Sequence, residues 1–134
     1  MRICSLILLL LFPSLSFAHG LGPNTQIVNV SKNANYFSFD IEATNMRRDV
    51  NRFYITVHDA EGTSIPFSST NRNFFLAPET NKKIKIFVVN NEREKYRVCT
   101  WANTSYLTVG PEQKVISGVC VSVSVRYFSA PGQQ

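Results

Sequence analysis

The feature that most constrains this chain is a two-residue alternation of apolar and polar side chains, which is longest near the C-terminus. From residue 119 to 127 every second side chain is apolar, and the side chains between them are cysteine, serine or arginine. The apolar members are Val119, Val121, Val123, Val125 and Tyr127. Successive side chains of a β-strand point to opposite faces, so this period predicts a half-buried strand.

The same period recurs along the chain and predicts an all-β fold. Residues 37–43 and 53–57 alternate clearly, and no window carries a helical apolar stripe over three turns. About seven strands separated by turn residues predict a single Ig-like antiparallel β-sandwich. Two sheets are needed because one sheet alone would leave an apolar face in water. The 134 residues suffice for one domain.

The first 18 residues have the pattern of a secretory signal peptide. Arg2 precedes an apolar run over residues 3–12, and small residues ending in Ala18 follow Pro13. The run is too short for a bilayer-spanning helix, which needs about 20 apolar residues. We therefore expect export, cleavage after Ala18, no membrane anchor after cleavage, and a single domain over residues 19–134.

Two cysteines, Cys99 and Cys120, remain after cleavage because Cys4 lies within the signal peptide. In an oxidising compartment an isolated pair is most simply a disulfide. Metal binding is the weaker interpretation, since neither cysteine has a histidine or second cysteine at ligand spacing. A bridge closing a loop of about 21 residues would contribute about 3 kcal/mol in the chain-entropy model. The spacing suits two neighbouring strands near Trp101 and is too short for the inter-sheet bridge of antibody domains.

The charge pattern argues against nucleic-acid binding. Lysine and arginine outnumber aspartate and glutamate by 14 to 9, a net charge of +5, but the basic residues are scattered. The one dense run, Lys82, Lys83 and Lys85, alternates with isoleucines and reads as the wet face of a strand.

Enzyme chemistry has little support, so we predict that the chain is not an enzyme. Besides His19, the only histidine is His58, and its neighbour Asp59 points to the opposite face of a strand, so the two do not form an orienting pair. There is no Gly-rich phosphate loop and no His-Glu-x-x-His zinc motif. We predict no cofactor in this interpretation, and only one alternative interpretation includes one.

That alternative is a small periplasmic copper-binding sandwich. Cleavage after Ala18 would leave His19 first, offering an amino group and an imidazole, the nitrogen ligands that suit copper. The beginning His19-Gly20 resembles that of secreted copper sandwiches, and His58 would be the second imidazole. In the simpler interpretation, His58 is merely solvated.

The last strand is the best candidate for function. A long apolar strand at a sheet edge pairs readily with an extended segment of another protein, by β-augmentation. The predicted binding residues are Val119, Val121, Val123 and Val125. In the other interpretation the strand lies inside a sheet and these valines are core.

Three segments resemble the N-terminal domain of the periplasmic pilus-assembly chaperones, the PapD-like family. The sequence Phe-Phe-Leu-Ala-Pro-Glu of residues 74–79, with the basic-apolar strand that follows, is similar to that family's F-x-L-x-P turn. Residues 92–98 resemble its acidic-Arg-Glu segment, and residues 119–125 resemble its seventh strand, which is lent to a pilus subunit. In one subset of the family a disulfide ties the sixth and seventh strands, as Cys99 and Cys120 would.

The resemblance implies a periplasmic, non-enzymatic protein of fimbrium biogenesis, whose partner is a pilus or surface-organelle subunit bound by β-strand addition. It implies Val121 and Val123 as apolar anchors, so we expect charged replacements to abolish capture with the fold intact. The family anchors the subunit carboxylate with an Arg on its first strand, absent from residues 25–30, and a Lys on its seventh, for which Lys114 is a loose match. A secreted structural or adhesive domain remains a third interpretation.

Overall fold

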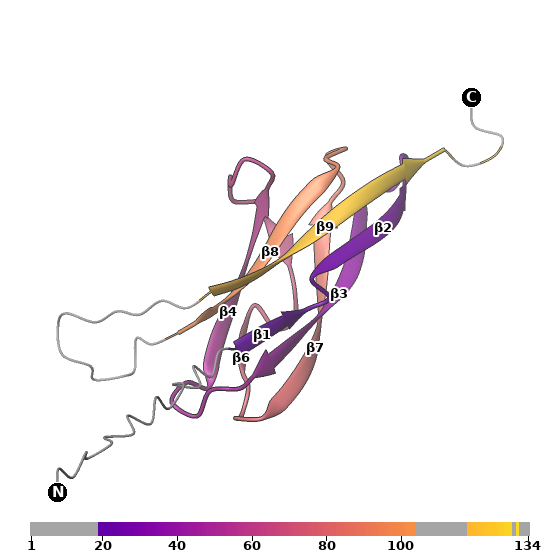
Figure 1. The fold of residues 1–134 in the computed structure, drawn as a ribbon. Helices are drawn as coiled ribbons and strands as arrows, with labels where there is room; N and C mark the ends of the chain where they lie inside the picture. The colour runs from indigo at the N-terminus through magenta and orange to yellow at the C-terminus, as the bar shows by residue number, and fades with distance from the viewer. Residues whose placement is uncertain (1–18, 104–117, 130, 132–134) are drawn as a thin grey trace, which may run out of the picture.

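The computed structural model describes residues 19–103, 118–129 and 131, and these form nine strands in two sheets and no helix (Figure 1). The four-stranded sheet has the order β1-β3-β7-β5, and the five-stranded sheet has the order β2-β9-β8-β4-β6. The strands are β1 (His19–Gly22), β2 (Thr25–Ser31), β3 (Tyr36–Asn45), β4 (Arg52–Asp59), β5 (Phe67–Ser68), β6 (Asn73–Phe75), β7 (Thr80–Val89), β8 (Lys95–Ala102) and β9 (Gly118–Phe128). The predicted Ig-like sandwich is therefore confirmed.

The alternation in the sequence becomes the layer structure of the sandwich. In β3, β4, β7 and β9 every second side chain points inward, and these side chains meet in one core between the sheets. The most deeply buried include Ile41, Val57, Ile84, Ile86, Val88, Val98, Val121 and Val123. One face of each sheet is therefore dry and the other wet.

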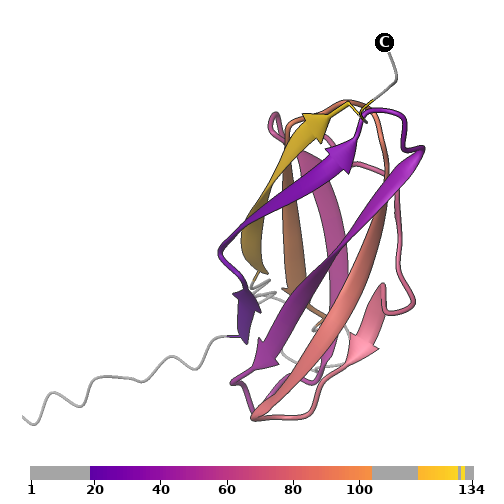
Figure 2. The ribbon, with the colours of Figure 1, turned by 90° about the vertical axis from the view of Figure 1, so that its right-hand side faces the viewer.

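The chain changes sheets near its start, which the alternation did not predict. Strand β1 pairs with β3, and after the cis Gly22-Pro23 bond the chain enters β2 in the other sheet (Figure 2). Strand β2 runs parallel to β9, so the expectation of a purely antiparallel sandwich is wrong at this pair. The reason is connectivity: β2 and β9 lie far apart in sequence and need no hairpin, so either direction is open to them.

A buried asparagine links the loop that follows β3 to the loop that follows β6. Asn45, at the end of β3, has no solvent exposure, and its Nδ2 donates to the carbonyl oxygens of Val50 and Leu76, each at 2.8 Å. Its Oδ1 accepts from the backbone N–H of Arg47 at 2.9 Å. One side chain thus satisfies backbone groups from two loops that would otherwise be buried without partners.

We predict that Asn45→Ala lowers the free energy of unfolding by about 2–4 kcal/mol, because it leaves buried carbonyls unpaired. Asn81→Ala is the matched control, since Asn81 is exposed and its Nδ2 makes one surface bond to Glu42. Urea unfolding of both variants measures the difference. Equal losses would contradict a special role for Asn45.

Candidate functional site

Strand β9 is covered along one side by β8 but only in part along the other. Strand β8 pairs with β9 from Gly118 to Ser124, whereas β2 pairs only from Ser122 to Phe128. Among the described residues no strand is hydrogen-bonded to residues 118–121 on the side away from β8, although β1 of the other sheet contacts β9. Figure 1 shows this start of β9 extending beyond β2.

The backbone groups that face this open side can be identified from the neighbouring bonds. The N–H of Ser122 donates to the carbonyl of Asn24 at 3.1 Å, on the β2 side, and the N–H of Val125 donates to Glu94 at 2.8 Å, on the β8 side. Because hydrogen-bonding direction alternates along a strand, the even-numbered residues face away from β8. The N–H and C=O groups of Gly118 and Cys120 therefore point to the open side.

The valines of β9 point into the core of their own domain. Val121 and Val123 are each 1% exposed and Val125 is also buried, while Val119 is half-buried at the end of the core. The expectation that charged residues at positions 121 and 123 would leave the fold intact is therefore wrong. These valines cannot leave the core to fill pockets elsewhere while the sandwich stays closed.

A disulfide fastens β9 to β8 beside the open segment. Cys99 and Cys120 lie directly opposite each other, with Cα atoms 4.0 Å apart and an S–S bond of 2.07 Å. The predicted bridge between neighbouring strands is confirmed. It holds the backbone of Cys120 in place although no strand among the described residues pairs with it on its other side.

Aromatic side chains cover the wet face of the sheet next to this segment. Trp101 stacks on Tyr54, with ring centroids 6.5 Å apart, and its Nε1–H donates to Thr56 Oγ1 at 2.8 Å. A Cβ atom at Gly118 would lie 2.3 Å from the indole ring, so only glycine fits there. Trp101 therefore packs closely against the backbone of Gly118, a contact that sequence reasoning missed.

The far end of β9 is held by a polar cluster. Arg93, before β8, forms an ion pair with Asp59 at the end of β4, and the hydroxyl of Tyr127 donates to the Arg93 carbonyl at 2.9 Å. Burial alone would raise the pKa of Asp59, but bonds from the Thr63 N–H and from Arg93 outweigh it, so the pKa lies below its usual value. Trp101 of β8 thus packs against one end of β9, and Tyr127 ties the other end to the backbone before β8.

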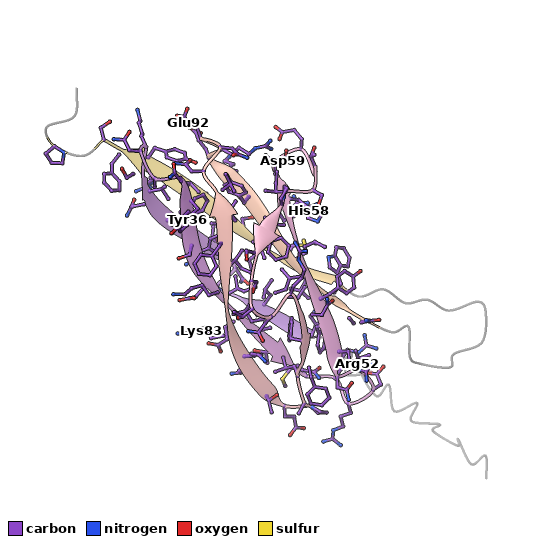
Figure 3. All side chains as sticks on the ribbon, turned by 180° about the vertical axis from the view of Figure 1, so that it is seen from behind. Tyr36, Arg52, His58, Asp59, Lys83 and Glu92 are labelled. Atoms are coloured by element: carbon purple, nitrogen blue, oxygen red, sulfur yellow. A yellow bond between two sulfur atoms is a disulfide. The ribbon has the colours of Figure 1, made fainter. Side chains whose placement is uncertain are left out.

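The two histidines lie apart, so the structure does not bring together the two imidazoles that the copper alternative needs. His19 is buried, its Nε2–H donates to the Thr100 carbonyl at 3.0 Å, and its ring lies 5.1 Å from that of Phe53. His58 lies five residues from Phe53 along β4, about 16 Å at the usual rise, and on the opposite face of the sheet. Figure 3 shows His58 and Arg52, the neighbour of Phe53, at opposite ends of this strand.

The remaining predicted sites lie outside the described residues. Lys114 is one, and so is the proposed signal peptide over residues 1–18, which therefore stays a prediction. Among the described residues no helix is long and apolar enough to cross a bilayer. The disulfide indicates an oxidising compartment.

We predict that Val123→Asp lowers the free energy of unfolding by about 3 kcal/mol or more, because it buries an unpaired carboxylate. Ser122→Asp is the matched control, since Ser122 is exposed on the same strand. Thermal unfolding of the two variants separates these cases. A fully stable Val123→Asp protein would contradict the burial of this strand.

A second prediction concerns acid. Burial lowers the pKa of His19 below its ordinary value of 6.5, so the folded state disfavours the protonated ring. Stability should therefore be complete above the unfolded pKa and fall as the pH drops below about 6.5. Urea midpoints between pH 8 and pH 5 measure this fall. It should shrink in His19→Gln and persist in His58→Gln; identical profiles would refute it.

No protein-family model matches the sequence, and no curated protein matches it. Solved structures do. The Escherichia coli chaperone DraB matches with a TM-score of 0.61 and 16% identity, over 83% of this chain and 55% of DraB. A chain from the Salmonella enterica SafA pilin–SafB chaperone complex matches with a TM-score of 0.64 and 15% identity, over 83% of this chain and 55% of its own.

A eukaryotic domain matches over nearly its full length. The PapD-like domain 7 of human CEP192 has a TM-score of 0.56 and 12% identity, over 97% of this chain and 98% of that domain. The present chain therefore spans about half the length of the pilus-chaperone chains it matches and the whole of a single PapD-like domain. At these identities the matches establish the fold alone. The chain has the PapD-like form of the Ig-like β-sandwich.

Proposed function

We propose that this protein is a binding module that pairs residues 118–121 of β9 with an extended segment of a partner protein. The observation that carries the proposal is the open side of β9, where no strand among the described residues is paired with the backbone groups of Gly118 and Cys120. Unpaired backbone groups at a sheet edge are what β-augmentation uses.

A comparison with the open edge of β7 favours this one. Within the described part of the chain, residues 80–86 of β7 are unpaired on one side, because β5 pairs only with Phe87 and Val88. That stretch carries Lys82, Lys83 and Lys85, and lysines on an edge discourage pairing with another chain. Residues 118–121 carry no charge, so nothing of this kind protects them.

The nature of the partner is inferred from the fold. The structures with this fold include the chaperone DraB and the SafA pilin in complex with the SafB chaperone. We propose that the partner here is a subunit of a pilus or another surface organelle, met in the periplasm after export. In this proposal the chain binds and does not catalyse, and it needs no cofactor.

Val119 is the residue through which the proposal can be tested without dismantling the core. It is half-buried at the end of the core, beside the open side. A lysine there would add the inward-pointing charge that natural edge strands use against pairing. We expect Val119→Lys to reduce partner capture about tenfold or more while the protein stays folded.

The measurement is purification of the tagged, exported protein from its native compartment, with co-purifying proteins identified by mass spectrometry. A near-stoichiometric small subunit that is lost in Val119→Lys and retained in Val89→Lys is the expected result. Val89 is the control because it is exposed on the other sheet. A clean monomer, or a partner indifferent to position 119, would refute the proposal.

Amide hydrogen exchange provides a test at single residues. In the free protein the N–H groups of Gly118 and Cys120 should exchange quickly, and those of Val119 and Val121, which face β8, slowly. Partner binding should slow only the fast pair. Slow exchange at Cys120 before any partner is added would contradict an open edge.

A further inference from the structure

The outer edge of β2 is a second place where the sheet ends without a partner strand. Strand β2 pairs with β9 on one side and is the last strand of its sheet (Figure 1). On its other side no strand lies among the described residues. Its seven residues, Thr-Gln-Ile-Val-Asn-Val-Ser, include no charged residue and no proline. Edges of this length are usually protected by charge, proline or a covering segment.

The backbone groups that face outward follow from two hydrogen bonds. Ser122 donates to the Asn24 carbonyl at 3.1 Å, and Lys32 donates to the Phe128 carbonyl at 3.0 Å. Residues 24 and 32 therefore face β9, and by alternation so do the even-numbered residues between them. The N–H and C=O groups of Thr25, Ile27 and Asn29 consequently point away from the sheet.

Side chains on this edge are suited to a copy of themselves. Ile27 lies on the wet face beside Ser124 and is 53% exposed. On the inner face Gln26 has a buried Oε1 that accepts no hydrogen bond among the described residues. The edge thus offers both an uncovered apolar side chain and an unused acceptor.

We propose that two copies of this chain pair through β2, antiparallel and related by a two-fold axis at Ile27. In this register Thr25 of one copy lies opposite Asn29 of the other, and the two Ile27 residues lie side by side. The residues with outward backbone groups, Thr25, Ile27 and Asn29, then lie opposite one another across the two-fold axis. Each of these pairs exchanges two backbone hydrogen bonds, giving about six in all. The sheets of both copies become one continuous sheet.

The same register gives both the exposed Ile27 and the unpaired Gln26 a partner in the second copy. The two Ile27 side chains cover each other on one face, where directly opposed apolar residues stabilise strand pairs. On the other face Gln26 is diagonal to Gln26 of the second copy, within reach of long side chains. If each Gln26 side chain turns from its buried position toward the edge, each amide can donate to the other's Oε1. No charged residue opposes another within β2, so the basic net charge does not forbid the contact.

This inference goes beyond the proposed partner binding and uses a different edge. Residues 118–121 are open on β9 itself, whereas the contact between copies lies on the outer side of β2. One strand pair buries little surface, so the dimer should be weak and dependent on concentration.

The test is sedimentation equilibrium of the exported, mature protein over a wide concentration range. The wild-type protein should approach twice the monomer mass, and Ile27→Lys should weaken dimerisation about tenfold or more, because it opposes two like charges. Val89→Lys, at a residue 59% exposed on the other sheet, should leave the dimer unchanged.

A charge-swap mixture tests the register. Ile27→Lys and Ile27→Glu should each be monomeric alone and should form a heterodimer when mixed, because residue 27 meets its own copy. A monomer at all concentrations, or a dimer that tolerates Ile27→Lys, would overturn the inference. Loss of a co-purifying subunit in Ile27→Lys without any dimer in the wild type would also overturn it. Retention of that subunit in Ile27→Lys separates this edge from the one at Val119.

Discussion

The structure depends on which residues of β9 point into the core and which point to water. Its odd-numbered residues bury their side chains and direct their backbone groups to β8, and its even-numbered residues face water and direct theirs to β2 or to the open side. A shift of one residue would put Ser122 and Ser124 in the core and the valines outside. The disulfide and the close fit of Trp101 on Gly118 both oppose that shift. The register that closes the sandwich is therefore the one that aims Cys120 outward.

Much of the fold could be predicted because a period of two is a local property. The alternation located the long strands and the two-sheet class, and the spacing of Cys99 and Cys120 pointed to neighbouring strands. Strand order is a long-range property, so the parallel pairing of β2 with β9 left no local trace. Strand β1 was missed because His-Gly-Leu-Gly has little intrinsic β preference and is held by pairing with β3.

The sequence predicted which strand carries the candidate site, but it did not predict which side chains of that strand a partner could reach. Alternation cannot tell whether a valine fills its own core or a partner's, because both uses need the same pattern. Burial settles this for Val121 and Val123. The histidine pair failed for a related reason, since the distance between His19 and His58 depends on which strands pair. Asn45 carried no signal, because an asparagine reads as a turn residue until its buried partners are known.

The placement of Trp101 has an optical consequence. It is the single tryptophan of the chain, and its indole lies against Gly118, at the first residue of β9, with Tyr54 on the neighbouring strand. Its emission therefore arises from one known position beside the open segment. Any molecule that covers this end of the sheet alters the solvation of that ring, so the protein carries an intrinsic fluorophore next to the surface of greatest interest.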